Sequence, residues 1–498
     1  MEPSLPPKPT RESLVAMCRD DPEKAADLIL MLWDKVEKLT AIVEAQGKEI
    51  AELKAKLAKN SKNSSKPPST DRSNPGGSGA TKSKKNSGSK NRAGGQKGHK
   101  GTTLQQSASP DHTIRLSHPQ HCSCGRSLAR TIQCGEVRRQ VHDLPEDIGI
   151  EVTEYHAPVC RCPGCGKKTT AEFPATVSAP VQYGPRVRAA AAYLHTYHLL
   201  PYARLAETFN DLFGCALSTG ALANFIREAA ARAGPLHEGI RGKIVASDFI
   251  HNDETGLNVL EKTCWLHTAS TPEYAYFVVT KGRSFEDIKS VGVLEGYTGR
   301  SIHDFLPAYL KFEGLKHGLC NVHHLRELTF IEEELCQRWA AEMSCLLLGA
   351  KELVEKEKEN GGRPGKEVIE EVRKDYRRIL ASGRRVNPPP AKIPGKRGRP
   401  AKGKALNLIE RFSNYEEEVL AFLIYEVPFD NNEAERDLRM MKTRQKISGC
   451  FRSLEWSNRF AKIRSVVTSA KKRSASVYEI LQLILTDTAK AEKLLFAT

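Results

Sequence analysis

An apolar residue recurs every three or four positions from Ile29 to Leu57, and this heptad repeat requires a long helix. Its a positions are β-branched except for Leu57, and its d positions are Leu except for Gln46. This combination favours a parallel two-stranded coil, in which one polar residue can fix the register. We therefore predict a coiled coil over residues 21–59 that joins two copies of the chain. The alternative is that this helix packs onto its own protein.

The composition changes abruptly after this helix. Residues 60–100 consist mainly of Ser, Gly, Asn and Lys, with ten Lys or Arg against the single Asp71. Such a stretch has no apolar spacing with which to bury a core. We expect residues 60–110 to form a disordered basic linker.

Charge and length indicate several domains and a polyanionic partner. The 498 residues carry a formal net charge of +16, and the pI is about 9.2. DNA is the commonest partner of such a basic chain. No apolar run reaches the ~18 residues of a membrane span, and the N-terminus lacks the apolar core of a signal peptide. We expect a cytoplasmic, nucleoid-associated protein that does not enter a membrane.

Cysteines cluster in the next segment, where six of thirteen lie between residues 122 and 165. In a reducing compartment this density indicates a metal site rather than disulfides. A C-x-x-C pair followed by glycine is typical of a zinc knuckle, and a histidine stands three residues before one of the upstream cysteines. We predict a zinc-binding domain over 111–175 with four ligands: His121, Cys124, Cys162 and Cys165. Cys122 and Cys160 are competing ligands, and Cys134 is a spare. The alternative is a set of small buried hydrophobic residues.

Residues 176–235 read as a helical pair. Pro201 and Gly214 mark the start and stop of one helix, and Ser218 is an N-cap for the next. Two apolar stripes should face each other across the turn: Leu205, Phe209 and Leu212 against Leu222, Phe225 and Ile226. This is the spacing of a DNA-binding helix-turn-helix, although any helical hairpin gives the same pattern.

Short strands follow. Residues 243–259, 263–269 and 274–280 read as three strands, the last with Tyr274, Tyr276 and Val278 in period-two alternation, and residues 284–291 read as a helix. A fourth strand ends at Asp304, and a fifth covers 316–322. This order predicts a mixed α/β sheet with Asp253 on its first strand. Neighbouring strand ends would bring Asp253 and Asp304 together around a divalent metal, whereas a lone Asp at a strand end usually caps a turn.

The stretch "FDNNEAERDLRMMKTRQK" over residues 429–446 mixes four carboxylates with five basic residues. Asp430 or Asn431 can cap a helix here, and Ala434, Leu438 and Met441 then form its apolar stripe. Glu435 lies beside that stripe, whereas Glu433 lies roughly 200° around the helix from it. We expect Arg439, Lys442 and Lys446 to follow the DNA backbone. The alternative is an ordinary surface ion pair of Glu435 with Arg439.

Four blocks carry a family resemblance: "HNDETGLNVL", "SIHDFLPAY", "CNVHHLREL" and "VPFDNNEAERDLRMMKTRQKISGCFRS". They resemble the catalytic blocks of bacterial DDE transposases of the insertion-sequence-sixty-six type, and blocks upstream resemble the same proteins in the same order. The chain departs from the family at His121, where a zinc-ligand Cys is usual, and at Trp456, where a small residue is usual.

The resemblance implies a multidomain α+β protein with a ribonuclease-H-like α/β catalytic core, whose catalytic acids fall on Asp253, Asp304 and Glu435. The core would span 236–330 and 425–475, interrupted by a helical insertion over 331–424 and followed by a helical tail over 476–498. Three such carboxylates can bind two Mg²⁺ ions roughly 4 Å apart for DNA cleavage and strand transfer.

The insertion contains "PGKRGRPAKGK", in which Arg397 and Arg399 belong to an AT-hook-like core that fits a narrow minor groove. A generic basic loop is the alternative. Cys320 and His323 suggest a second metal pair, but with no further ligand in view we interpret them as core or supporting residues, with Arg326 as a phosphate or carboxylate partner.

Together these patterns predict a transposase that binds transposon ends and target DNA, holds Mg²⁺ and Zn²⁺, and forms a homodimer or higher oligomer, with accessory transposition proteins as possible partners. Three other functions would share parts of the sequence. A DNA-binding regulator derived from a transposase would not need the three acids, a structure-specific nuclease would lack strand transfer, and a structural coiled-coil protein would explain none of the carboxylate blocks.

Overall fold

The structure is a computed structural model whose described residues fall into two units. The first unit contains those within 1–77, 174–205 and 218–498, and the second those within 78–173 and 206–217. The described residues are 10–57, 106–117, 119–130, 136–145, 148–161, 163–174, 176–390 and 400–497.

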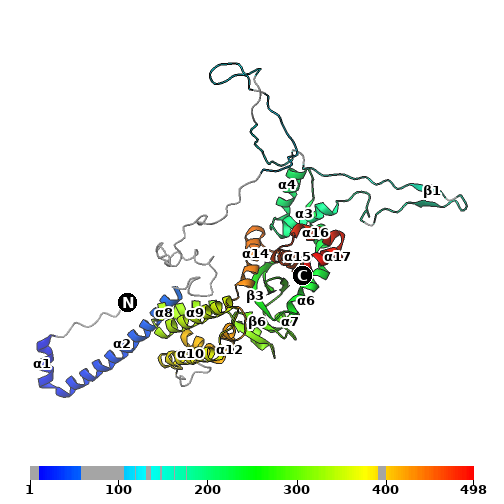
Figure 1. The fold of residues 1–498 in the computed structure, drawn as a ribbon. Helices are drawn as coiled ribbons and strands as arrows, with labels where there is room; N and C mark the ends of the chain where they lie inside the picture. The colour runs from blue at the N-terminus through cyan, green and yellow to red at the C-terminus, as the bar shows by residue number, and fades with distance from the viewer. Residues whose placement is uncertain are drawn as a thin grey trace. The chain divides into compact units, whose positions relative to one another are not determined.

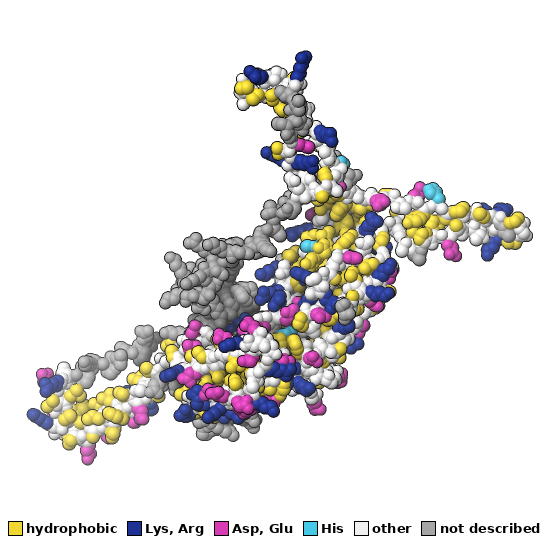
Figure 2. All heavy atoms as spheres, in the orientation of Figure 1, with side chains coloured by type: hydrophobic (Ala, Val, Ile, Leu, Met, Phe, Trp, Pro, Cys, Tyr) yellow, Lys and Arg dark blue, Asp and Glu magenta, His cyan; other side chains and the backbone are white. Residues whose placement is uncertain are grey.

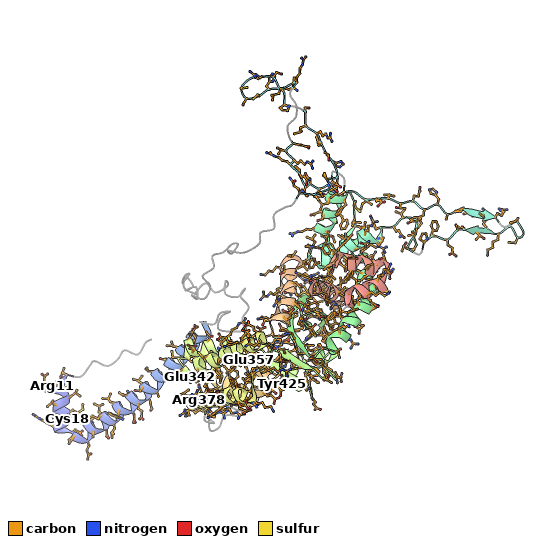
Figure 3. All side chains as sticks on the ribbon, in the orientation of Figure 1. Arg11, Cys18, Glu342, Glu357, Arg378 and Tyr425 are labelled. Carbon is orange, nitrogen blue, oxygen red and sulfur yellow. The ribbon has the colours of Figure 1, made fainter. Side chains whose placement is uncertain are left out.

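Two helices open the chain. Helix α1 (Arg11–Asp20) is capped by the Thr10 side chain, and helix α2 (Pro22–Leu57) is 36 residues long (Figure 3). The long helix confirms that part of the prediction, whereas α1 was not foreseen. The apolar heptad residues from Ile29 to Val43 are 50% to 65% exposed, and hydrophobic side chains gather along these helices in Figure 2. Pairing of two copies remains a prediction, and most of the predicted linker, residues 58–105, lies outside the described residues.

The second unit contains a small antiparallel hairpin. Strand β1 (Val159–Arg161) pairs with β2 (Lys168–Thr170), with Cys160 opposite Thr169. A separate bridge joins His121 to Ser127.

Four helices lie between β2 and the main sheet: α3 (Pro185–Thr196), α4 (Tyr202–Phe213), α5 (Thr219–Arg232) and α6 (Gly234–Val245). The boundaries of α4 and α5 agree with the sequence, because Gly214 follows α4 with φ +59° and the Ser218 hydroxyl accepts the N–H of Ala221. One member of the predicted stripe is wrong, since Leu212 is 53% exposed. Binding of DNA by this helical pair stays a prediction.

The sheet has five strands: β3 (Phe249–Val259), β4 (Lys262–Ser270), β5 (Ala275–Thr280), β6 (Arg300–His303) and β7 (Lys316–Leu319). Their order is β5-β4-β3-β6-β7. Strands β3 and β6 of this sheet are labelled in Figure 1. Strands β3, β4 and β5 are antiparallel, whereas β6 is parallel to both β3 and β7. The predicted mixed sheet, with helix α7 (Phe285–Ser290) between β5 and β6, is confirmed. The first strand begins later than predicted, because residues from Lys243 to Val245 still belong to α6.

Both faces of the sheet are covered at β5. Tyr276 and Phe277 are 4% and 1% exposed and belong to different hydrophobic clusters. Strand β5 is an edge strand, and helix α15 (Leu454–Lys472) supplies hydrogen-bond partners for its outward backbone N–H groups. Ser469 accepts the N–H of Ala275 at 3.0 Å, and Ser465 accepts the N–H of Phe277 at 2.9 Å. An edge strand held in this way cannot pair with another chain.

Helices occupy the region of the predicted insertion, but they begin at Asn321, ten residues before the predicted start. The region contains α8 (Asn321–Leu335), α9 (Arg338–Glu359), α10 (Lys366–Val386), α11 (Lys404–Asn414), and the short α12 (Glu416–Val419) and α13 (Ala421–Ile424). The helices share a core that includes Trp339, Tyr376 and Phe412. Charged side chains such as Glu342 and Arg378 lie on their surface (Figure 3).

Three further helices complete the chain: α14 (Asn432–Ser448), α16 (Val477–Thr486) and α17 (Thr488–Phe496). Helix α14 packs on β3 and β4, and α16 packs on α3. No helix in the described part of the chain is both long and apolar enough to cross a membrane.

Candidate active site

The sheet register brings two predicted acids together. Strand β3 pairs in parallel with β6 over three residues, from Phe249 opposite Arg300 to His251 opposite Ile302, a constant offset of 300 − 249 = 51. Asp253 and Asp304 have the same offset, 304 − 253 = 51. Continuing the register by two residues therefore places these carboxylates side by side, just beyond the hydrogen-bonded part of the ladder.

Glu435 reaches the same end of the sheet through Asn431. The buried Asn431 side chain donates to the backbone oxygen of Asn252 at 2.8 Å, and its oxygen lies 3.0 Å from Nδ1 of His251. This side chain thus links the start of α14 to β3 and does not form the predicted helix cap. The other predicted cap residue, Asp430, accepts the N–H of Asn432 at 3.0 Å. Glu435 follows in the first turn of α14.

The predicted apolar stripe of α14 is confirmed. Ala434, Leu438 and Met441 are all buried, and the last two belong to the cluster that covers β4 and β5. This packing fixes the rotation of the helix, so that Glu435 is half-buried beside the stripe.

The acids interact electrostatically. Burial raises the pKa of Asp253 well above its ordinary value, and the charges of Glu254, Asp304 and Glu435 raise it further. Mutual repulsion of this kind favours either a retained proton or a bound cation. Asp304 also accepts the N–H of Leu306 at 3.1 Å, a contact that orients its carboxylate.

A fourth acid, Glu254, was missed from the sequence. Its side chain is 3% exposed, and burial followed by the charge of Asp304 raises its pKa to about 7. The hydroxyl of Tyr309 donates to Glu254 at 3.0 Å, and Arg283 lies 3.5 Å from its other oxygen. Neighbouring side chains on a strand point to opposite faces, so strand periodicity offers no reason to group Glu254 with Asp253.

Glu433 and Glu435 differ in their ion-pair and hydrogen-bond partners. The ammonium of Lys472 lies 2.7 Å from both Glu433 and Asp437, which also accepts a hydrogen bond from Ser270 at 2.8 Å. Glu435 has an oxygen, Oε1, that is buried without a hydrogen-bond partner. The ion pairs of the described residues do not include Glu435 with Arg439.

Glu435 instead lies against the start of α8. Its Oε1 is 3.7 Å from Nε2 of His323. The ligand atoms of Cys320, His323 and Glu435 all lie within 4.8 Å of one another, the one such group of three in the described part of the chain. The interpretation of Cys320 and His323 as lacking a further ligand is therefore corrected. The structure supplies the third residue from a helix more than a hundred positions away.

The predicted DNA-binding residues divide into two sets. Arg439, Lys442 and Lys446 are exposed along α14, and Lys442 donates to the backbone oxygen of Gly256 at 2.9 Å. Arg397 and Arg399 lie outside the described residues.

The predicted zinc ligands are partly described. His121, Cys124 and Cys165 are exposed, whereas Cys162 lies outside the described residues. Glycines with φ of +88° and +70° directly follow Cys124 and Cys165, as a knuckle turn requires. The backbone N–H and the thiol of Cys124 lower the pKa of the Cys122 thiol, so Cys122 stays a competing ligand.

The fold and the site define a mixed α/β protein with carboxylates clustered where β3, the end of β6 and the start of α14 meet. A family model described as the Transposase IS66 family matches residues 180–458, which include the whole sheet, the insertion and α14. The chain belongs to this transposase family. A second model, for a family of unknown function (DUF6444), matches residues 8–105. The comparison with curated proteins finds no match.

Proposed function

We propose that the chain is a DDE transposase, in which Asp253, Asp304 and Glu435 hold two Mg²⁺ ions, cleave the transposon ends and join them to target DNA. One observation carries the proposal: the sheet register sets Asp253 beside Asp304, and the charges of Asp304 and Glu435 both act on Asp253. The five-stranded mixed sheet supports a ribonuclease-H-like catalytic core.

The donor set fits a hard divalent cation, because carboxylate oxygens are the ligands that Mg²⁺ prefers. Bound ions of this kind activate water or a 3′-hydroxyl and stabilise the leaving oxygen of an in-line displacement. In hydrolysis, the water oxygen bonds to phosphorus as the bond to the 3′-oxygen breaks, which frees a 3′-hydroxyl. That hydroxyl then attacks a target phosphodiester and displaces its 3′-oxygen.

Several side chains hold the elements of this site in place. Asn431 holds α14 against β3. Tyr309 and Arg283 contact Glu254, the residue next to Asp253 on β3. We further propose that Arg439 and Lys446 contact the DNA backbone, that His121, Cys124, Cys162 and Cys165 bind Zn²⁺, and that α2 pairs two copies so that two transposon ends are held together.

The test compares two neighbouring glutamates. Glu435→Gln should abolish Mg²⁺-dependent cleavage of a labelled transposon end while DNA binding is retained. Glu433→Gln is the matched control, because Glu433 is already neutralised by Lys472, and it should retain most cleavage. The opposite pattern, or normal cleavage by both variants, would place the third acid elsewhere.

A structure-specific nuclease is the alternative that shares the acidic site. It would cleave without joining, so a strand-transfer assay with a pre-cleaved end separates the two functions. A regulator would bind ends and do neither reaction.

A further inference from the structure

The junction of α8 and α14 brings together a thiol, an imidazole and a carboxylate. Cys320 is the N-cap residue of α8 and is 1% exposed, and His323 stands in the first turn of the same helix. Glu435 comes from the first turn of α14. The three ligand atoms lie within 4.8 Å of one another.

Two of these groups have buried atoms without a partner. Nδ1 of His323 and Oε1 of Glu435 are both buried and make no hydrogen bond, and the 3.7 Å between Nε2 of His323 and Glu435 is too long for one. Leaving such atoms unsatisfied costs free energy. A cation shared by Nε2 of His323 and Oε1 of Glu435 would give the buried glutamate oxygen a partner, because ligands at 2.0–2.3 Å around a tetrahedral ion lie about 3.3–3.8 Å apart.

The thiol is surrounded as a metal-bound thiolate would be. The backbone N–H of Asn431 donates to Sγ of Cys320 at 3.2 Å. A coordinating metal would deprotonate this thiol outright, and the Asn431 N–H would then donate to the thiolate.

We propose that Cys320, His323 and Glu435 form a binding site for a thiophilic divalent cation of the Zn²⁺ class, separate from the N-terminal cysteine module. A thiolate and an imidazole select such an ion over Mg²⁺, which prefers oxygen ligands. One thiolate and one carboxylate also balance its double charge, which suits a largely buried site. Three protein ligands leave a fourth position for water or a substrate oxygen.

The site goes beyond the proposed function, and it would hold Glu435 in place through an ion additional to the two Mg²⁺ ions. Because Glu435 is also the proposed third acid, its own variant cannot separate the two roles. The variants that do so are Cys320→Ser and His323→Gln, which leave Asp253, Asp304 and Glu435 intact.

The experiment measures zinc in the full-length chain, without DNA, after equilibration with ZnCl₂ and gel filtration. Cys320→Ser and His323→Gln should each hold about one equivalent less zinc than the wild type. With Co²⁺ as the probe, the thiolate-to-cobalt absorption should fall in Cys320→Ser. Cys264→Ser is the matched control, because Cys264 is a buried thiol on β4 within an apolar cluster, and it should leave zinc unchanged.

If Cys320→Ser does not fold, His323→Gln still tests the site, because His323 is only half-buried and its replacement should disturb the fold less. Wild-type zinc content in a folded His323→Gln protein, or in both variants, would overturn the site. Asp253→Asn separates this result from the proposed function: it should lose Mg²⁺-dependent cleavage and keep the zinc.

Discussion

The acidic site of the sheet and the N-terminal cysteine module differ in how far apart their metal-binding residue types lie in the sequence and in how deeply they are buried. Asp253, Asp304 and Glu435 come from three distant segments, yet a packed sheet and a buried helix stripe bring them to one end of the sheet. The four described cysteines of the module, Cys122, Cys124, Cys160 and Cys165, are close in sequence but exposed, in a unit with two three-residue strands. Folding therefore assembles the first site, whereas the second, if it binds zinc as we propose, would owe much of its order to the metal.

The largest effect should come from the acids. Asp253→Asn and Asp304→Asn should each lower the rate of transposon-end cleavage by roughly 10³-fold or more, because each removes a charge that only the metal-bound site uses. Circular dichroism and thermal unfolding should change little, since the sheet is assembled by its core. A variant that lost its fold instead would show that the carboxylates support structure, and the contrast between the two regions would fail.

The second effect concerns the cysteine module. Replacing both Cys162 and Cys165 with Ser should remove about one equivalent of zinc and make residues 106–174 sensitive to protease. The sheet and insertion should remain resistant, because their cores do not depend on that metal. Retention of all the zinc by this double variant would contradict the ligand set, and protease resistance of the module would show that it folds without metal.

The third effect is on assembly. Deleting residues 1–59 should lower the mass measured by sedimentation to about half if α2 pairs two chains. DNA binding should persist and should still weaken steeply with salt, because phosphate contacts by Lys and Arg release counterions. An unchanged mass would mean that the apolar face of α2 packs within one chain.

Sequence patterns predicted the elements better than the contacts between them. The five strands and the stripe at Ala434, Leu438 and Met441 followed from periodicity, because alternation and helical spacing report which side of an element is buried. Helix α1 was missed because it buries none of its own residues. Leu212 was misassigned because an apolar residue on a short helix is not always buried.

The site was only partly predictable for a related reason. Asp253 lies within the first strand and Asp304 directly follows the fourth, and both strands could be indicated from the sequence. The group of Cys320, His323 and Glu435 joins positions 435 − 323 = 112 residues apart, and Glu254 meets Tyr309 across a gap of 55 residues. No local spacing encodes such contacts, which arise only when the sheet and helices pack.

The smallest effect is a pH dependence of stability. Glu254 has a pKa of about 7 in the folded chain against an ordinary value of 4.5, so the unfolded state releases this proton first as the pH rises. Its contribution to stability is therefore present at low pH and is lost between about pH 4.5 and about pH 7. Glu254→Gln should flatten this part of the curve, measured by thermal unfolding at about pH 5 and about pH 8. Parallel curves for the two proteins would show that Glu254 does not hold a proton in the fold.

Locating the catalytic ions tests the central claim most directly. Anomalous diffraction from crystals of the full chain with Mn²⁺ in place of Mg²⁺ should show metal bound by Asp253 and Asp304, with Glu435 completing the site. Under saturating Mn²⁺, metal bound elsewhere and none between Asp253 and Asp304 would contradict the account.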